Sequence, residues 1–137
     1  MAAVYTHRVR YHETDAQGFL FNARYLEVAD VAMTEWLRSL GFTYDALVAD
    51  GLDVSVVTAT IHFKSPARFD DVLDADVRCT RVGRSSFVLA VEISRAGDAV
   101  ATVDLVYVNV DTATATSRPL PEFFTRALVD PRDGPRP

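Results

Sequence analysis

Cysteine is nearly absent from this sequence: Cys79 is the single one among 137 residues, so no disulfide can form within the chain. A lone cysteine is typical of a reducing compartment, and we expect a cytoplasmic protein. Apolar runs of roughly 20 residues, the length of a membrane-spanning helix, are also absent. The first residues, MAAVYTHRVRYHE, lack the apolar core of a signal peptide. We therefore expect neither a disulfide-stapled secreted domain nor a membrane partner.

Basic residues are too few for a nucleic-acid-binding surface. The chain has 14 lysines and arginines against 19 acidic residues, a net charge of −5, so a broad basic face is not available to bind phosphates. Histidine is scarce as well, and His7 and His62 show no metal-ligand spacing with Cys79 or with each other. The sequence also lacks a glycine-rich phosphate loop. We expect no nucleic acid, no metal and no cofactor.

The composition that remains is that of an ordinary globular domain, with 49% apolar and 24% charged residues. A chain of this length is long enough for one hydrophobic core and too short for two. We predict a single domain over residues 1–128. The Pro-, Gly- and Arg-containing end, residues 129–137, is predicted to be a disordered tail.

One long helix is predicted over residues 23–40. Apolar side chains recur there at helical spacing, and their stripe is wide. Asn22 stands where an N-cap is expected, and Gly41 stands where a C′ glycine is expected. A helix that is apolar over so much of its surface is expected to be enclosed by other elements.

The rest of the chain is predominantly strand-like. Alternating apolar and polar residues, broken by turn residues such as Gly83 and Gly97, predict strands over 4–11, 54–64, 72–82, 86–95 and 99–110. Short turns between successive strands indicate antiparallel pairing. We predict an α+β fold in which a five-stranded antiparallel sheet wraps around the long helix.

The sheet is expected to have two different faces. In the strand over 54–64, Val57, Ala59, Ile61 and Phe63 lie on one predicted inner face. The outer face holds valines with few charges among them: Val54, Val56, Val100, Val106, Val108 and Val110. An apolar outer face predicts a homodimer or homotetramer.

The segment TDAQGFLFNARYLEVADVAMTEWLRSLG resembles the hot-dog-fold acyl-CoA thioesterases of the 4-hydroxybenzoyl-CoA thioesterase family. The segments FKSPARFDDVL, RVGRSSF and RPLPEFF resemble later parts of that domain, so the likeness covers about residues 4–128. The resemblance implies the hot-dog fold and acyl-CoA hydrolysis, with Asp15 as the catalytic carboxylate and the N–H at Asn22 polarising the carbonyl. It also implies that the pantetheine arm enters a crevice between subunits.

The chemistry of thioester hydrolysis suits this segment. It needs an activated water or a protein nucleophile, together with donors for the developing oxyanion. Asp15 can serve as base or nucleophile, and the backbone N–H groups near Asn22 and Ala23, at the start of a helix, can bind the oxyanion. The alternatives are an Asx-turn for Asp15 and a plain N-cap for Asn22.

Further residues are assigned to binding or to structure. Gly18, Phe21 and Ala23 are predicted to contact substrate. A serine nucleophile is not predicted, because Ser85 and Ser86 lack a nucleophile-elbow motif and no Ser-His-Asp order is indicated. Arg81 and Arg84 bracket a turn and are predicted to bind the phosphates of coenzyme A; the alternative is a pair of solvated charges.

Four residues near these sites are predicted not to be catalytic. Glu13 and His12 are expected at the surface or in a supporting position, and Tyr25 and Trp36 in the core.

The function predicted from the sequence is hydrolysis of acyl-CoA to the free acid and coenzyme A. Two alternatives stay open: an acyl-(acyl-carrier-protein) thioesterase, and a non-catalytic acyl-CoA-binding hot-dog domain. An acidic chain offers little basic surface to dock a carrier protein, which favours acyl-CoA as the substrate. The sequence does not specify the acyl chain.

Overall fold

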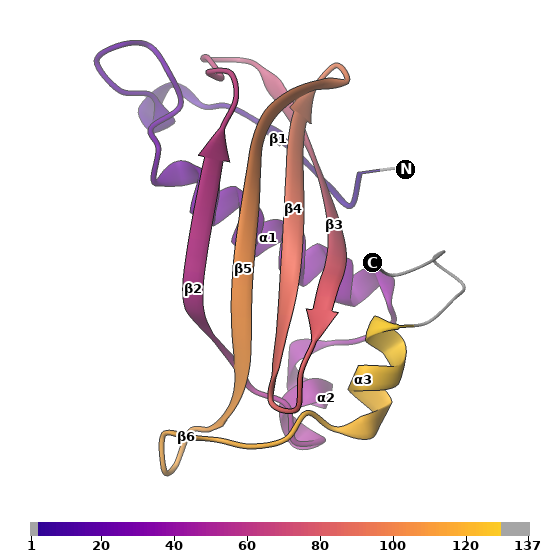
Figure 1. The fold of residues 1–137 in the computed structure, drawn as a ribbon. Helices are drawn as coiled ribbons and strands as arrows, with labels where there is room; N and C mark the ends of the chain where they lie inside the picture. Colours follow the sequence, from indigo (N-terminus) through magenta and orange to yellow (C-terminus); the bar gives the residue numbers. More distant parts are fainter. Residues whose placement is uncertain (1–2, 130–137) are drawn as a thin grey trace. The chain divides into compact units, whose positions relative to one another are not determined.

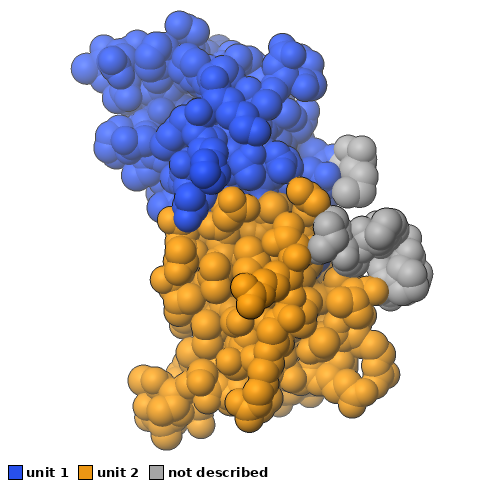
Figure 2. Space-filling view, viewed as in Figure 1, with its two compact units in different colours: residues 1–36, 60–77, 91–103 blue, residues 37–59, 78–90, 104–137 orange. Residues whose placement is uncertain are grey.

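The computed structural model describes residues 3–129. The chain forms two compact units, coloured separately in Figure 2: Met1–Trp36, Thr60–Val77 and Val91–Val103 make up unit 1, and Leu37–Ala59, Arg78–Ala90 and Asp104–Pro137 make up unit 2. The single domain predicted over 1–128 stays a prediction. All but the first residue of the predicted tail, 129–137, lies outside the described residues.

The strands form one antiparallel sheet (Figure 1), as the sequence predicts. Their bounds are β1 Tyr5–Arg8, β2 Val54–Phe63, β3 Val72–Val82, β4 Ser86–Arg95, β5 Asp98–Asp111 and β6 Thr116–Ser117. They are ordered β1-β3-β4-β5-β2, and the short β6 pairs with β5. In β1 and β3 the pairing runs from Tyr5 opposite Ala75 to Arg8 opposite Val72. The first strand is shorter than predicted, because a 3₁₀ turn, η1, occupies Tyr11–Glu13.

Alternation along the central strands places one face of each in the core. In β3 the buried residues are Leu73, Ala75, Val77 and Cys79, and in β4 they include Phe87, Leu89, Val91 and Ile93. These buried rows follow the apolar–polar alternation on which the two strands were predicted. Burial of this apolar surface is the main contribution to folding free energy.

Strand β2 differs from the prediction. It ends the strand order, and every residue in it is at least partly exposed, including the predicted inner residues Val57 (57%) and Phe63 (55%). The predicted inner row is therefore not buried within residues 3–129, although the ring of Phe63 contacts that of Tyr25 in the long helix. Val100, predicted for the outer face, is fully buried. Its carbonyl accepts hydrogen bonds from the N–H groups of both Lys64 and Ser65, just after β2 ends at Phe63.

The long helix α1 spans Arg24–Ser39, within one residue of the prediction at each end. Its buried residues are Tyr25, Val28, Ala29, Ala32 and Trp36. Gly41 follows with φ +92°, the left-handed conformation predicted for a C′ glycine. Two shorter helices complete the structure, α2 at Tyr44–Ala49 and α3 at Glu122–Leu128. None of the described helices is long and apolar enough to cross a membrane.

Unit 2 contains a fully buried polar side chain, Asn109 of β5. Its Oδ1 accepts from the N–H of Asp53 at 2.9 Å, and its Nδ2 donates to the carbonyls of Gly51 and Pro119 at 2.9 and 3.0 Å. Because all of these groups are paired, the buried amide ties two loops to β5 without the penalty of an unsatisfied polar group.

Candidate active site

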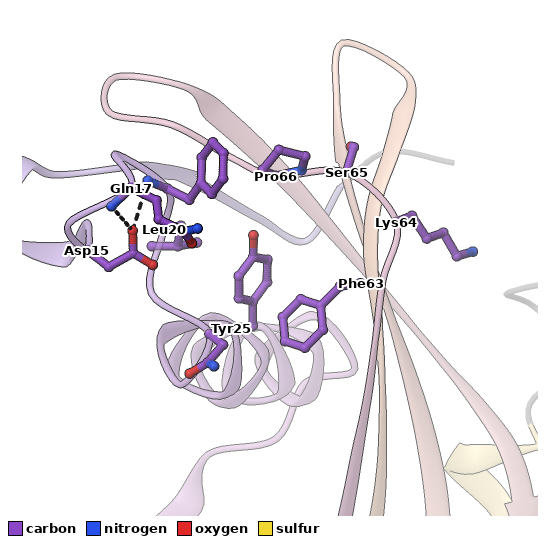
Figure 3. Close-up of a pocket in the computed structure, with 10 residues that line it drawn as sticks. Asp15, Gln17, Leu20, Tyr25, Phe63, Lys64, Ser65 and Pro66 are labelled. Carbon is purple, nitrogen blue, oxygen red and sulfur yellow. Dashed lines mark hydrogen bonds between the residues drawn. The ribbon is translucent and has the colours of Figure 1, made fainter.

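Asp15 lies in a tight turn whose geometry its own side chain stabilises. Oδ1 accepts hydrogen bonds from the N–H groups of Gln17 at 2.9 Å and Phe19 at 3.2 Å (Figure 3). The Gly18 N–H donates to the Asp15 carbonyl, and Gly18 has φ +80°, which favours glycine. The Asx-turn considered for Asp15 is therefore present. It uses one carboxylate oxygen, and no described residue donates a hydrogen bond to the other, Oδ2.

Backbone bridges hold the ends of this turn in place. Thr14 pairs with Leu20, and Phe19 pairs with Arg68, in isolated antiparallel bridges. The Leu20 N–H also donates to the carbonyl of Ala67 at 2.7 Å. The guanidinium of Arg68 lies over the Phe19 ring, 4.9 Å from its centroid. The Asp15 turn is thus fastened to the segment between β2 and β3.

The start of α1 provides hydrogen-bond donors. The first turn is closed by the Arg24 N–H, which donates to the Phe21 carbonyl at 2.9 Å. The N–H groups of Asn22 and Ala23 donate to no described residue, as expected at the N-terminus of a helix. The Asn22 side chain also makes no hydrogen bond to the described chain, so the predicted N-cap is not formed. Two backbone donors at the positive end of the helix dipole are left for an anionic or polarised oxygen.

A pocket of about 410 Å³ in unit 1 brings Asp15 and Asn22 together. Its lining residues are Asp15, Gln17, Phe19, Leu20, Asn22, Tyr25, Phe63, Lys64, Ser65 and Pro66. Figure 3 shows the rings of Tyr25 and Phe63 side by side across the pocket from Asp15, with Lys64 extending away from it. The wall is thus mostly apolar, with one carboxylate and a few amide and hydroxyl groups, the usual character of a small-molecule site.

Tyr25 is both a core residue, as predicted, and a wall of this pocket. Only 2% of it is exposed. Burial raises the pKa of the Tyr25 phenol, and the negative charges of Asp15 and Asp71 raise it further, against the lowering by the backbone of Ala67 and by Arg95. The phenol is therefore neutral at physiological pH.

Several residues that line the pocket were not predicted from the sequence, namely Gln17, Leu20, Phe63, Lys64, Ser65 and Pro66. The last four come from the end of β2 and the break after it. The Ser65–Pro66 break was visible in the sequence, but nothing in the local pattern places it beside the Asp15 turn.

The predicted substrate contacts are placed as follows. Gly18, Phe21 and Ala23 flank the lining residues without being among them, and Phe21 is 47% exposed. Arg81, near the end of β3, and Arg84, in the turn that follows, are both exposed in unit 2 and do not line the pocket. Their role in binding coenzyme A stays a prediction. Within residues 3–129, no group of three His, Cys, Asp or Glu side chains is arranged to hold a metal ion.

Comparison with known proteins identifies the class. Residues 17–102 match the model of the thioesterase superfamily, and this chain belongs to that family. A putative esterase from Aquifex aeolicus is 30% identical over 87% of this chain and 93% of its own length. The acyl-CoA thioester hydrolase YbgC from Escherichia coli is 32% identical over 84% of this chain and 87% of its own.

Solved structures agree with this assignment. A hypothetical protein from Aquifex aeolicus superposes with a TM-score of 0.83 at 28% identity, covering 90% of this chain and 97% of that one. A gentisyl-coenzyme A thioesterase superposes with a TM-score of 0.82 at 26% identity, covering 92% and 99%. The hot-dog fold and the prediction of a thioester-hydrolysing enzyme are confirmed. The narrower 4-hydroxybenzoyl-CoA thioesterase family is not specifically supported.

Proposed function

We propose that this protein hydrolyses acyl-CoA thioesters, with Asp15 as the catalytic carboxylate and the N–H groups of Asn22 and Ala23 as the oxyanion donors. The observation that carries the proposal is that only one of the two Asp15 carboxylate oxygens is used by the turn. Oδ1 accepts the two hydrogen bonds that hold the turn, while Oδ2 has no partner among the described residues, and Asp15 lines a pocket that Asn22 also lines.

The proposed reaction begins with the thioester carbonyl directed at the start of α1. As a base, Asp15 Oδ2 takes a proton from a water whose oxygen attacks the carbonyl carbon. As a nucleophile, Oδ2 attacks that carbon itself and forms a mixed anhydride that water then hydrolyses. In both routes the carbonyl oxygen becomes an oxyanion that accepts hydrogen bonds from the two free N–H groups, and collapse expels the coenzyme A thiolate.

The relatives favour coenzyme A over a carrier protein as the acyl donor. The curated YbgC proteins are named acyl-CoA thioester hydrolases, and other relatives hydrolyse 1,4-dihydroxy-2-naphthoyl-CoA. A non-catalytic acyl-CoA-binding domain does not need a free carboxylate oxygen in its pocket, whereas hydrolysis does. The acyl group stays open, although the rings of Phe19, Tyr25 and Phe63 offer flat apolar walls to it.

The proposal includes a homodimer or homotetramer whose subunits share the site. Strand β2 offers a ten-residue edge with exposed apolar side chains, a surface that pairs readily with a second strand. Phe63 belongs both to that strand and to the pocket, so a second copy docked along β2 would narrow the pocket mouth. We further propose that the sheet wraps α1 as in a hot-dog fold and that the protein is cytoplasmic, which its single, buried cysteine favours.

The decisive experiment substitutes Asp15. Asp15→Asn keeps the side-chain oxygen that accepts from Gln17 and Phe19 and removes only the negative charge. We expect kcat on benzoyl-CoA and hexanoyl-CoA to fall by about 10²–10⁴ with KM nearly unchanged, the loss expected for a positioned base or nucleophile. Thiol release measures the rate. Wild-type rates for Asp15→Asn on every acyl-CoA tested would return Asp15 to a purely structural role.

Two further measurements sharpen the result. Asp15→Ala removes the turn acceptor as well, so it is expected to lower the melting temperature more than Asp15→Asn does, while lowering kcat by at least as much. Single-turnover hydrolysis in ¹⁸O-water addresses the two routes, because an acid product without label would contain a carboxylate oxygen of Asp15.

A further inference from the structure

Glu13 is a buried carboxylate two residues before Asp15, and one of its two oxygens has two close polar partners. Only 7% of the residue is exposed. Its Oε1 lies 2.9 Å from His7 Nε2 and accepts the Arg10 N–H at 2.7 Å. On the other side of the imidazole, His7 Nδ1 lies 3.0 Å from the Tyr5 hydroxyl. The carboxylate is thereby anchored to β1, the strand that contains Tyr5 and His7.

The backbone of Glu13 is engaged as well. Its carbonyl accepts a hydrogen bond from the N–H of Phe21 at 2.9 Å. The next pair of residues towards the tip of the loop, Thr14 and Leu20, forms an isolated antiparallel bridge. These contacts close the loop at its base. Asp15 lies two residues after Glu13 in the sequence. Asn22 and Ala23, which have the free N–H groups, directly follow Phe21. Both halves of the proposed catalytic arrangement therefore extend from the same pair of residues.

We infer that the Glu13–His7 pair positions the catalytic loop: it sets the placement of Asp15 relative to the oxyanion donors. This inference rests on the proposed function of Asp15. Glu13 is a positioning residue and takes no part in the chemistry, since it does not line the pocket and Oε1 already has two partners. A displacement of about 1 Å in a reacting group is enough to lower a rate by about a hundredfold.

The charge state of Glu13 agrees with this role. Burial raises the pKa of its carboxyl, but the Arg10 N–H, the hydrogen bond to His7 and the charges of His7 and Arg10 outweigh burial and leave the pKa lowered. The group is thus an anion at neutral pH, and an anion is the stronger acceptor for both donors. Arg10 also approaches the second oxygen, at 3.9 Å.

The test compares Glu13→Ala with Glu13→Gln. The alanine variant loses both side-chain hydrogen bonds, whereas glutamine keeps an oxygen acceptor at the same place. For Glu13→Ala we expect kcat on benzoyl-CoA to fall about 10- to 100-fold with KM changed less than about threefold. Glu13→Gln is expected to recover most of the loss. His7→Ala combined with Glu13→Ala is expected to be no worse than Glu13→Ala alone, because both act through one contact.

Asn109→Ala is the matched control for stability, because it removes a buried hydrogen-bonded side chain from unit 2 without touching the loop. We expect it to lower the melting temperature at least as much as Glu13→Ala and to leave kcat within about twofold at a temperature where both are folded. Wild-type kcat in Glu13→Ala, or an equal loss of kcat in Asn109→Ala, would overturn the inference.

Amide hydrogen exchange gives a readout independent of activity. In Glu13→Ala the Phe21 amide is expected to exchange at least about tenfold faster relative to the amide of Leu47 in α2, which donates to the Thr43 carbonyl just before that helix. Unchanged relative exchange would contradict the inference even if Asp15→Asn were inactive. If Asp15→Asn were fully active while the Phe21 amide of Glu13→Ala exchanged faster, the proposed function of Asp15 would be wrong. The role of Glu13 in ordering the loop would still hold.

Discussion

The ring of Phe63 meets the ring of Tyr25 edge to face, with centroids 5.1 Å apart and an interplanar angle of 88°. Tyr25 is buried at the start of α1, and Phe63 is the last residue of an exposed strand. The contact fixes a half-exposed ring as a pocket wall, and such aromatic pairs contribute about 0.5–1.5 kcal/mol beyond the area they bury.

Truncation of this wall is expected to weaken substrate binding without changing the chemistry. For Phe63→Ala we predict a KM for benzoyl-CoA about 5- to 30-fold higher, equivalent to roughly 1–2 kcal/mol of lost contact, with kcat within about threefold. Val57→Ala is the control, since Val57 is equally exposed on the same strand and does not line the pocket. An equal effect in both variants would mean that the strand, and not the ring, is responsible.

The exposed edge of β2 predicts self-association. Sedimentation equilibrium at micromolar concentration is expected to give at least twice the 15.1 kDa of one chain. Val57→Lys should shift the mass towards that of one chain, because a charge in an apolar interface is left unpaired. Val48→Lys, a partly exposed valine on α2, serves as the control and is expected to keep the wild-type mass. A monomeric wild type would contradict the shared site.

Arg81 and Arg84 are predicted to bind the coenzyme A phosphates. Arg81→Ala with Arg84→Ala is expected to raise KM about tenfold with kcat nearly unchanged, because the phosphates lie far from the reacting carbonyl. Added salt should raise the KM of the wild type more than that of the double variant. Arg126→Ala, an exposed arginine on α3, is the control. An unchanged KM would leave the two arginines as ordinary surface charges.

The lowered pKa of Glu13 predicts a specific response of stability to acid. In the folded protein the Arg10 N–H and His7 hold this carboxyl ionised below its ordinary pKa of about 4.3. In that range the unfolded chain binds the proton first, so the contribution of Glu13 is present above about pH 4.3 and is lost as the pH falls through the folded-state pKa. Urea midpoints measured from pH 7 to pH 3 should converge between the wild type and Glu13→Gln. A constant difference would contradict this linkage.

The sequence predicts the regular elements well, because their signals are local. The alternation in β3 and β4 gives their bounds, and the helical period of α1 is followed by Gly41, the residue that ends it. The sequence does not reveal which side chains meet. Glu13 was predicted at the surface or in a supporting position, and only the fold identifies its partner, His7, across a buried hydrogen bond. Likewise Phe63 and Pro66 enter the pocket from about 45 residues beyond the Asp15 turn, which periodicity does not reveal.

The edge strand shows a different limit. The alternating pattern that includes Val57 and Phe63 correctly predicts a strand. The same pattern is expected whether the apolar face is covered by the chain itself or by another molecule, so it does not predict which of the two applies. The Asn22 side chain illustrates the same point at a helix start: its residue type suits a cap, yet its side chain lines a pocket and makes no capping bond.

The turn at Asp15 has an evolutionary consequence. Because Oδ1 alone satisfies the Gln17 and Phe19 amides, an asparagine at this position would retain the loop while losing the anion. Under the catalytic role proposed for Asp15, a single-base change in the codon would therefore separate an active member of such a lineage from a well-folded inactive one. Descendants that became pure ligand carriers would be expected to differ from their catalytic ancestors first at this atom, with the surrounding architecture left intact.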